Sequence, residues 1–300
     1  NIFKTGNSND WGYTYDNIYR ANVVLDNIDK IEIRPDEQAA KDDLKGQAYF
    51  LRGKSFLQAA IIWSQAYDEG SGANALGIPL RVNSDFNIPT TRSTIKQTYD
   101  QIVSDFRNAA MLLPESSIHP VRPSKAAAFG FLARTFLAMR KYDDCFVYAD
   151  LCLQLKSTLL DYDTYSPLSC SSNPSSVFTR FNAEVIYDAY MLAPGVLSRN
   201  KAKCDSVLYA MYADDDRRKD LFFNCNTGFR GHYSGTTTGF SGIAVDEVLL
   251  MRAECYARKG MTDSALADLN TLLQSRWKKS VPYPEITAND ANEALDHILV

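Results

Sequence analysis

The sequence repeats one helical-hairpin pattern three times, and this repeat limits the folds available to the chain. Each copy has a small residue, an aromatic residue three positions later, and then three small or apolar residues with gaps of four and three. Such gaps place side chains on one helical face, and a small residue lets two helices approach closely. The repeat predicts stacked tetratricopeptide-like hairpins, an α–α superhelix, and therefore a mainly α fold. The copies are Ala133, Phe136, Cys145, Ala149 and Cys152; Ala253, Tyr256, Ala265, Leu269 and Leu272; and Gly53, Phe56, Ile102, Phe106 and Ala109, where the last copy has about 37 additional residues between its two helices.

Apolar periodicity and capping signals place the helices of these hairpins. Thr94 with Gln97 forms a capping-box pattern at a helix start, and Gly260 stands where a left-handed residue ends a helix. From Phe56 to Trp63 the sequence is apolar almost all round the helix, so we expect neighbouring elements to enclose this segment. The predicted helices cover residues 12–29, 42–67, 94–113, 124–139, 143–156, 245–259 and 263–276, with a further helix from Glu293 to Val300.

Two stretches interrupt the helices and set the expected domain organisation. Residues 68–93 are a loop insertion, and residues 157–244 are polar and irregular, with a short extended segment at Glu184–Met191. We expect a single domain over residues 1–300 that is truncated at both ends. Its helical scaffold would cover residues 12–67, 94–156 and 245–300, and residues 157–244 would form an irregular, ligand-facing lobe with a few short strands and small helices.

Composition and charge exclude several classes of protein. The 32 basic and 36 acidic side chains give a net charge of −4, whereas a duplex nucleic-acid binder normally has a basic excess on one face. No apolar run reaches the ~18 residues that suggest a membrane span. The 45% of hydrophobic residues exclude a wholly disordered chain. The sequence therefore predicts a globular protein without a nucleic-acid partner.

The sequence contains no recognisable catalytic or metal-binding motif. The strings GxSxG, HExxH and GxxxxGK[ST] are absent, and His119, His232 and His297 are scattered. We therefore predict no catalysis, no cofactor and no metal ion. The run Asp214 to Asp216 is compatible with the oxygen ligands of calcium. We favour an acidic turn whose charges offset Arg217 to Lys219, which follow directly.

Eight segments carry a family resemblance through their order and spacing. They are WGYTYDNIYRANVVLDNID, GQAYFLRGKSFLQAAIIWSQAYD, GIPL, TYDQIVSDFRNAAMLLP, RPSKAAAFGFLARTFLAMRKYDDCFVYADLCL, AEVIYDAY, DDDRR and DEVLLMRAECYARKGMTDSALADLNTLLQSRW. Together they resemble the SusD/RagB family of outer-membrane nutrient-binding lipoproteins over essentially the whole chain. The resemblance implies tetratricopeptide-like hairpins that carry an irregular lobe.

The resemblance also implies a location, a partner and a ligand. Members of this family are held on the surface of Gram-negative cells by a lipid on an N-terminal cysteine. They cover a SusC-like TonB-dependent transporter and capture glycans, or in some members peptides, for import. The anchor cysteine and the family's continuation after Val300 are not in this sequence, so an outer-membrane location is an expectation from the resemblance alone.

A glycan ligand sets clear requirements for its binding site. Sugar rings have apolar C–H faces and a rim of hydroxyl groups, so binding needs exposed aromatic rings beside amide, carboxylate or guanidinium groups. Loop aromatics meet this need better than Trp63 and the repeat aromatics, which we expect in the core. The candidate ligand-binding clusters are Trp11 with Asn7, Asn9 and Asp10; Tyr162 with Tyr165; and Phe229 with Arg230, His232 and Tyr233.

Alternatives to a glycan-binding role stay open. Trp11 would have no ligand role if it packed as a staple on the helix that follows it, although the resemblance favours the ligand role because this segment borders the glycan face in several members. A peptide-capturing member of the family would differ in its ligand. A cytosolic tetratricopeptide adaptor would bind peptide tails in a concave groove lined with Lys, Arg and Asn, but the insertion and the irregular lobe would obstruct that groove.

Overall fold

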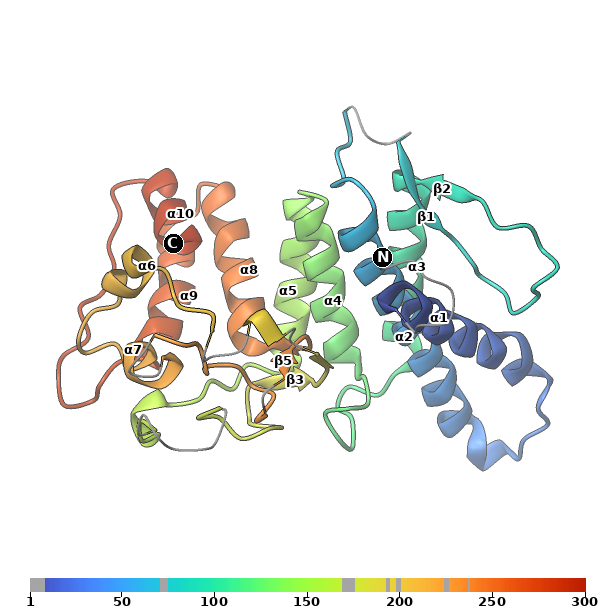
Figure 1. Cartoon of the computed structure of the whole chain (residues 1–300), viewed down its shortest axis with the longest axis horizontal. Coiled ribbons are helices and arrows are strands. Elements are labelled where there is room, and N and C mark those ends of the chain that lie inside the picture. Colours follow the sequence, from blue (N-terminus) through green and yellow to red (C-terminus); the bar gives the residue numbers. More distant parts are fainter. Residues whose placement is uncertain are drawn as a thin grey trace. The chain divides into compact units, whose positions relative to one another are not determined.

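Paired helices form most of the described chain, which confirms the predicted mainly α fold (Figure 1). The computed structural model describes residues 9–70, 75–168, 176–192, 195–197, 201–223, 227–236 and 238–300. The chain divides into two compact units. The first is Asn1–Ser117 with Pro123–Cys152, and the second is Ile118–Arg122 with Leu153–Val300. The single domain and its predicted internal boundaries stay predictions.

Four helices and part of a fifth build the described first unit, together with one strand pair. α2 packs against α1 and α3, and α3 also packs against α4. The two strands lie in the predicted loop insertion and pair antiparallel, with Leu76 opposite Thr94. The elements are α1 (Asp10–Asn27), α2 (Gln38–Trp63), β1 (Leu76–Pro79), β2 (Arg92–Thr94), α3 (Ile95–Leu112), α4 (Lys125–Ala138) and α5 (Tyr142–Leu155), of which α5 belongs to this unit up to Cys152.

Side-chain caps begin α1 and α3 close to the predicted positions. At α1 the Asn9 side chain accepts a hydrogen bond from the Gly12 amide at 2.8 Å, and at α3 Thr94 and Gln97 form the predicted capping box. Such caps satisfy backbone N–H groups that have no partner within the helix. The largest boundary difference is at α2, which was predicted at 42–67 and lies four residues earlier, at 38–63.

The repeat positions form the contacts between paired helices. Phe56 on α2 and Phe106 on α3 are fully buried, and a Cβ on Gly53 would lie 3.1 Å from the Asp105 Cβ. The absent side chain of Gly53 therefore lets the two helices approach closely, as the repeat predicts. In the next hairpin, the buried Cys152 Sγ on α5 lies 3.2 Å from the carbonyl oxygen of Ala126 on α4. The hairpins are confirmed, and their assembly into a superhelix stays a prediction.

The C-terminal turn of α2 differs from the prediction that neighbours enclose it. Ala59 and Ala60 are buried, but Ile61 and Ile62 are 59% and 62% exposed and Trp63 is half-buried. Each residue turns about 100° round an α-helix, so only the face that contains Ala59 and Ala60 lies against a neighbour. The next two side chains point towards solvent.

The second unit combines a helical hairpin, a further helix and the irregular stretch. Helices α8, α9 and α10 pack on one another. Gly260, at φ 77°, stands between α8 and α9 and confirms the predicted left-handed stop. β3 pairs with β6 and β4 pairs with β5, both antiparallel, so the predicted short strands and small helices are present. The elements are β3 (Val185–Tyr187), β4 (Tyr190–Met191), α6 (Ser206–Met211), α7 (Arg217–Phe222), β5 (Gly239–Phe240), β6 (Ile243–Ala244), α8 (Val245–Arg258), α9 (Thr262–Gln274) and α10 (Ala291–Leu299).

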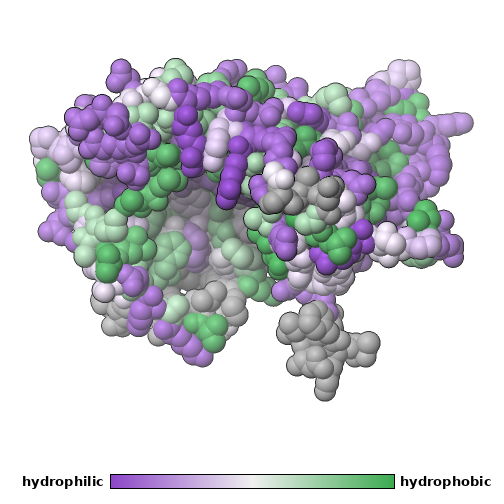
Figure 2. Space-filling model, turned by 90° about the horizontal axis from the view of Figure 1, so that it is seen from above, coloured by the Kyte–Doolittle hydropathy of each residue, from purple (hydrophilic) through white to green (hydrophobic). Residues whose placement is uncertain are grey.

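The surface carries both polar and apolar side chains. Hydrophilic residues cover much of the face in Figure 2, with smaller apolar areas between them. Among the helices that the structure describes, none combines the length and the apolar character needed to cross a bilayer. Large apolar side chains that are well exposed include Phe86, at 76%.

Candidate ligand-binding site

The structure buries three of the predicted ligand residues in the second unit. Tyr162, Arg230 and Tyr233 are only 1%, 2% and 5% exposed. Tyr162 and Tyr233 belong to one apolar cluster with Phe178, against which the half-buried Tyr165 also packs. The expectation that these side chains present themselves to a ligand is wrong, because they form the interior of the irregular stretch.

A buried polar network explains why these tyrosines lie inside. The Tyr233 hydroxyl donates to Glu184 Oε2 at 2.5 Å and lies 2.7 Å from the Tyr162 hydroxyl. Arg276 forms an ion pair with Glu184 at 2.7 Å, and its guanidinium carbon lies 4.0 Å from the centre of the Tyr162 ring. Burial and the nearby Glu184 carboxylate raise the pKa of Asp246, whose Oδ2 lies 3.3 Å from the Tyr233 hydroxyl oxygen, to about 6. The network holds together segments that are far apart in sequence.

Glycine allows close packing in this region of the second unit. A Cβ on Gly231 would lie 2.2 Å from the Phe222 ring, so this glycine allows the backbone to rest directly on an aromatic side chain. His232 is half-buried, and burial lowers its pKa. Phe229 remains 48% exposed and packs against Phe222 at 5.7 Å. Phe229 is therefore the exposed aromatic ring of this predicted cluster, because Tyr233 is buried.

The predicted cluster at the start of α1 has a different outcome. Asn7 lies outside the described residues. Asn9 caps α1, and the backbone carbonyl of the exposed Asp10 accepts a hydrogen bond from Thr14 Oγ1 at 2.7 Å. Trp11 is 37% exposed and follows directly in the first turn. The structure therefore leaves Trp11 as the accessible ring of this cluster.

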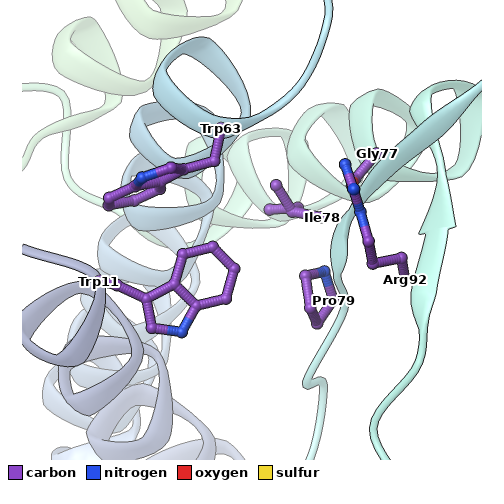
Figure 3. Close-up of a pocket in the computed structure, with 6 residues that line it drawn as sticks. All are labelled: Trp11, Trp63, Gly77, Ile78, Pro79 and Arg92. Atoms are coloured by element: carbon purple, nitrogen blue, oxygen red, sulfur yellow. The ribbon is translucent and has the colours of Figure 1, made fainter. Parts of the chain in front are cut away.

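Trp11 lies in an aromatic corner that also contains Trp63 (Figure 3). The two indoles meet edge to face, with ring centroids 5.0 Å apart and an interplanar angle of 74°. Tyr15, one helical turn after Trp11, also packs against the Trp11 ring, with ring centroids 4.6 Å apart. Trp11 thus packs on its own helix, as the alternative interpretation held, and still keeps an open surface. We expected Trp63 in the core, but it forms a wall of this corner.

A cavity of about 460 Å³ opens beside the two indoles. A second cavity, of about 680 Å³, shares Trp63 and Arg92 with the first, so the two adjoin. The first is lined by Trp11, Trp63, Gly77, Ile78, Pro79 and Arg92 (Figure 3). The second is lined by Ile62, Trp63, Ser64, Gln65, Leu76 and Arg92.

Strand β1 forms one wall of the first cavity and is held tightly in place. A Cβ on Gly77 would lie 2.2 Å from Thr98 Oγ1, so only glycine lets β1 lie this close to α3. The Tyr15 hydroxyl donates to the Pro79 carbonyl at 2.8 Å and ties α1 to the same strand. Burial raises the pKa of Tyr15, so this phenol stays protonated and able to donate.

Arg92 supplies the charge of the first cavity. Its Nε donates to the Gly77 carbonyl at 2.7 Å and its Nη2 to the Leu76 carbonyl at 3.0 Å. These two hydrogen bonds fix the guanidinium against β1. A guanidinium has five N–H groups, so further donors remain for a ligand. The cavity therefore combines flat apolar walls with fixed hydrogen-bond donors, which suits a ligand that has apolar faces and oxygen acceptors.

Sequence reasoning missed Trp63, Arg92 and strand β1 as site residues. Trp63 was assigned to the core because it ends an apolar helix, and Arg92 stands in an unremarkable loop. The available signal was the GIPL string at residues 77–80, which includes three residues that line the cavity. This string contributes to the resemblance but was not predicted as part of a site.

Residues 1–137 match the family model of SusD-like proteins that is described as "Starch-binding associating with outer membrane". The first 137 residues are thus similar to SusD-like proteins. The matched residues include all those that line the first cavity. No curated protein sequence matches the chain.

Solved structures establish the SusD-like fold over almost the whole chain. A SusD-like carbohydrate-binding protein from Bacteroides vulgatus is 22% identical, with a TM-score of 0.74 over 97% of this chain and 65% of that one. A SusD superfamily protein from Bacteroides thetaiotaomicron is 21% identical, with a TM-score of 0.74 over 96% of this chain and 70% of that one. A laminarin-binding SusD-like protein is 16% identical, with a TM-score of 0.63 over 93% and 72%. The chain thus spans about two thirds to three quarters of the length of these structures.

The acidic run Asp214 to Asp216 forms a salt-bridged turn, as we favoured. Asp216 pairs with Arg218 at 2.6 Å, and Asp214 pairs with Lys219 at 2.7 Å. Asp215 pairs with Lys278 at 3.1 Å. In the described part of the chain, no three side chains of His, Cys, Asp or Glu are grouped so that they could hold a metal ion.

Proposed function

We propose that this SusD-like protein is a non-catalytic cell-surface protein that captures glycans and passes them to a SusC-like TonB-dependent transporter. The observation that carries the proposal is the edge-to-face pair of Trp11 and Trp63 beside Arg92. Indole faces contact the C–H groups of a sugar ring, and guanidinium N–H groups donate to its hydroxyl oxygens. Both kinds of contact are available in one cavity.

The size and the lining of the cavity support binding rather than catalysis. A volume of about 460 Å³, with a second cavity adjoining, lies within the range of small-molecule sites. Glycoside hydrolysis needs two convergent carboxyl groups. The residues that line the two cavities include neither a carboxylate nor a histidine.

The comparisons support the ligand class and the location. The family description mentions starch binding and association with the outer membrane, and a structural neighbour binds laminarin, which is also a glucan. We infer that this protein works at the cell surface, held by an N-terminal lipid anchor. The transporter partnership rests on the family resemblance.

A binding screen tests the proposal. The purified protein would be titrated by calorimetry with maltodextrins, laminarin oligosaccharides and a glycan array on one side, and with mixed peptides on the other. We expect saturable binding of at least one glycan and none of the peptides. Binding of peptides alone would contradict the glycan proposal and indicate a peptide-capturing member of the family. If the peptides bind by their tails, the result would instead indicate the adaptor role.

A further inference from the structure

The aromatic surface of the candidate site continues beyond the cavity along α1. Trp11, Tyr15 and Tyr19 follow one another at intervals of four residues and therefore share one side of the helix. Eight residues of α-helix span about 12 Å. At the far end of this stretch, Tyr19 stacks on Phe86, with ring centroids 5.4 Å apart and an interplanar angle of 28°.

Phe86 is exposed, but its loop is firmly braced. The ring is 76% exposed and stands in the segment between β1 and β2. Arg81 stands near the start of this segment, and its Nη1 donates to the Ile88 carbonyl at 2.6 Å and to Thr90 Oγ1 at 2.7 Å. Its Nη2 donates to the Asp85 carbonyl. One guanidinium therefore closes the loop on both sides of Phe86.

The same loop is fixed to α1 by a second set of hydrogen bonds. Asp26 accepts from both the amide and the hydroxyl of Ser84 at 2.7 Å. Asn22 donates to the carbonyl oxygens of Arg81 and Asn83 at 2.8 and 3.0 Å. These contacts order a loop that would otherwise be flexible, and ordering it costs conformational entropy. The result is an aromatic ring held in a fixed position at the surface.

The surroundings of Phe86 suit a sugar better than a purely apolar partner. Asp85 and Asn87 stand on either side of the ring in sequence, and the Asn87 amide side chain donates to Asp85 Oδ1 at 2.9 Å. Polar groups beside an aromatic face can form hydrogen bonds with the hydroxyl groups of a sugar whose ring stacks on that face. In the adjoining cavity, by contrast, the exposed apolar residues are Ile62 and Leu76, which offer no flat ring.

We propose that Tyr19 and Phe86 form a second stacking position for the same glycan that enters the Trp11 cavity. This inference rests on the proposed function and adds a chain-length preference to it. The ligand would be an oligosaccharide long enough to reach from Trp11 to Phe86. Shorter sugars would contact the cavity alone and bind more weakly.

The test is a titration of glucan oligosaccharides from the disaccharide to the octasaccharide, in both the maltodextrin and the laminarin series. The variants are Phe86→Leu, Phe86→Trp and the loop control Ile88→Ala, which removes a 44% exposed aliphatic side chain. For Phe86→Leu we expect about tenfold weaker binding of the long oligosaccharides and unchanged binding of the disaccharide, since one ring contact is lost. Ile88→Ala should behave like the wild type, and Phe86→Trp, which keeps an aromatic ring, should retain the preference for long oligosaccharides that Phe86→Leu loses. Arg81→Ala, which removes the brace and leaves the ring, should reproduce the loss.

The outcomes separate this inference from the proposed function. If Phe86→Leu binds every oligosaccharide as the wild type does, while Trp11→Ala binds none of them well, the second stacking position is overturned and the glycan site stands. If Ile88→Ala weakens binding as much as Phe86→Leu, general apolar contact replaces ring stacking and the inference is also overturned. If the wild type binds no glycan, both proposals fall. Thermal melts of each variant check that the fold is intact.

Discussion

Tyr233 donates its phenolic proton to Glu184 Oε2 at 2.5 Å, inside the irregular stretch of the second unit. The sequence had suggested that this ring faces a ligand. The hydrogen bond instead makes Tyr233 part of the interior, together with Tyr162 and the Glu184–Arg276 ion pair. A substitution here should therefore change stability and leave ligand affinity alone.

Tyr233→Phe is the direct test of this structural role. The variant keeps the ring but leaves the Glu184 carboxylate without one of its donors, so the free energy of unfolding should fall by about 1–3 kcal/mol. Chemical denaturation measures the change, and calorimetry should show unchanged glycan affinity. Tyr190→Phe is the matched control, because that ring is 58% exposed and its stability should hardly change. Weaker glycan binding by a stable Tyr233→Phe protein would contradict the assignment.

Asp246 should make stability depend on pH. Burial and the Glu184 carboxylate raise its pKa to about 6 in the folded protein, against about 3.9 in an unfolded chain. The folded state therefore holds a proton between these values that the unfolded state has lost, so this contribution is complete below pH 4 and disappears as the pH rises through 6. Relative to Asp246→Asn, the wild type should lose up to about 1.4 kcal/mol per pH unit over that window. Parallel pH curves for the two proteins would refute it.

Gly77 should be intolerant of any side chain. In Gly77→Ala the new Cβ would meet Thr98 Oγ1 at 2.2 Å and the Thr94 carbonyl oxygen at 2.7 Å, so β1 must move away from α3. We expect a loss of about 1–3 kcal/mol in the free energy of unfolding, together with weaker glycan binding because β1 lines the cavity. Gly70→Ala is the control, since the nearest atom to its Cβ would be Asp68 Oδ1 at 3.8 Å. Equal melting temperatures for the two variants would disprove this account of β1.

The helical scaffold could be predicted because its signals are local and repeated. A small residue such as Gly53 or Ala133, an aromatic residue three positions later and a matching stripe on the next helix report directly on packing between neighbours in sequence. Capping residues such as Thr94 then fixed the helix starts within a few residues. These features depend on short stretches of chain, so one sequence was enough.

The site was harder to predict because its walls come from separate segments. Trp11, Trp63 and Arg92 belong to α1, α2 and β2, and their meeting depends on how these elements pack. The burial of the rejected candidates was equally hard to foresee, because it depends on contacts such as the close packing that Gly231 allows against Phe222. Phe86 was not predicted as a site residue, since a single ring in a polar loop does not indicate that Arg81 holds this loop by hydrogen bonds.

The central claim is that the Trp11–Trp63 corner binds a glycan, and calorimetry of Trp11→Ala tests it most directly. The glycan that the wild type binds best would be titrated into Trp11→Ala and into Ile61→Ala, a control that removes a 59% exposed side chain from the last turn of α2. We predict that Trp11→Ala weakens binding by ~1–3 kcal/mol, or about 5- to 150-fold, because a ring contact and its buried area are lost. Its melting temperature should stay close to that of Ile61→Ala, which should bind normally. Unchanged glycan affinity in a folded Trp11→Ala protein would contradict the claim.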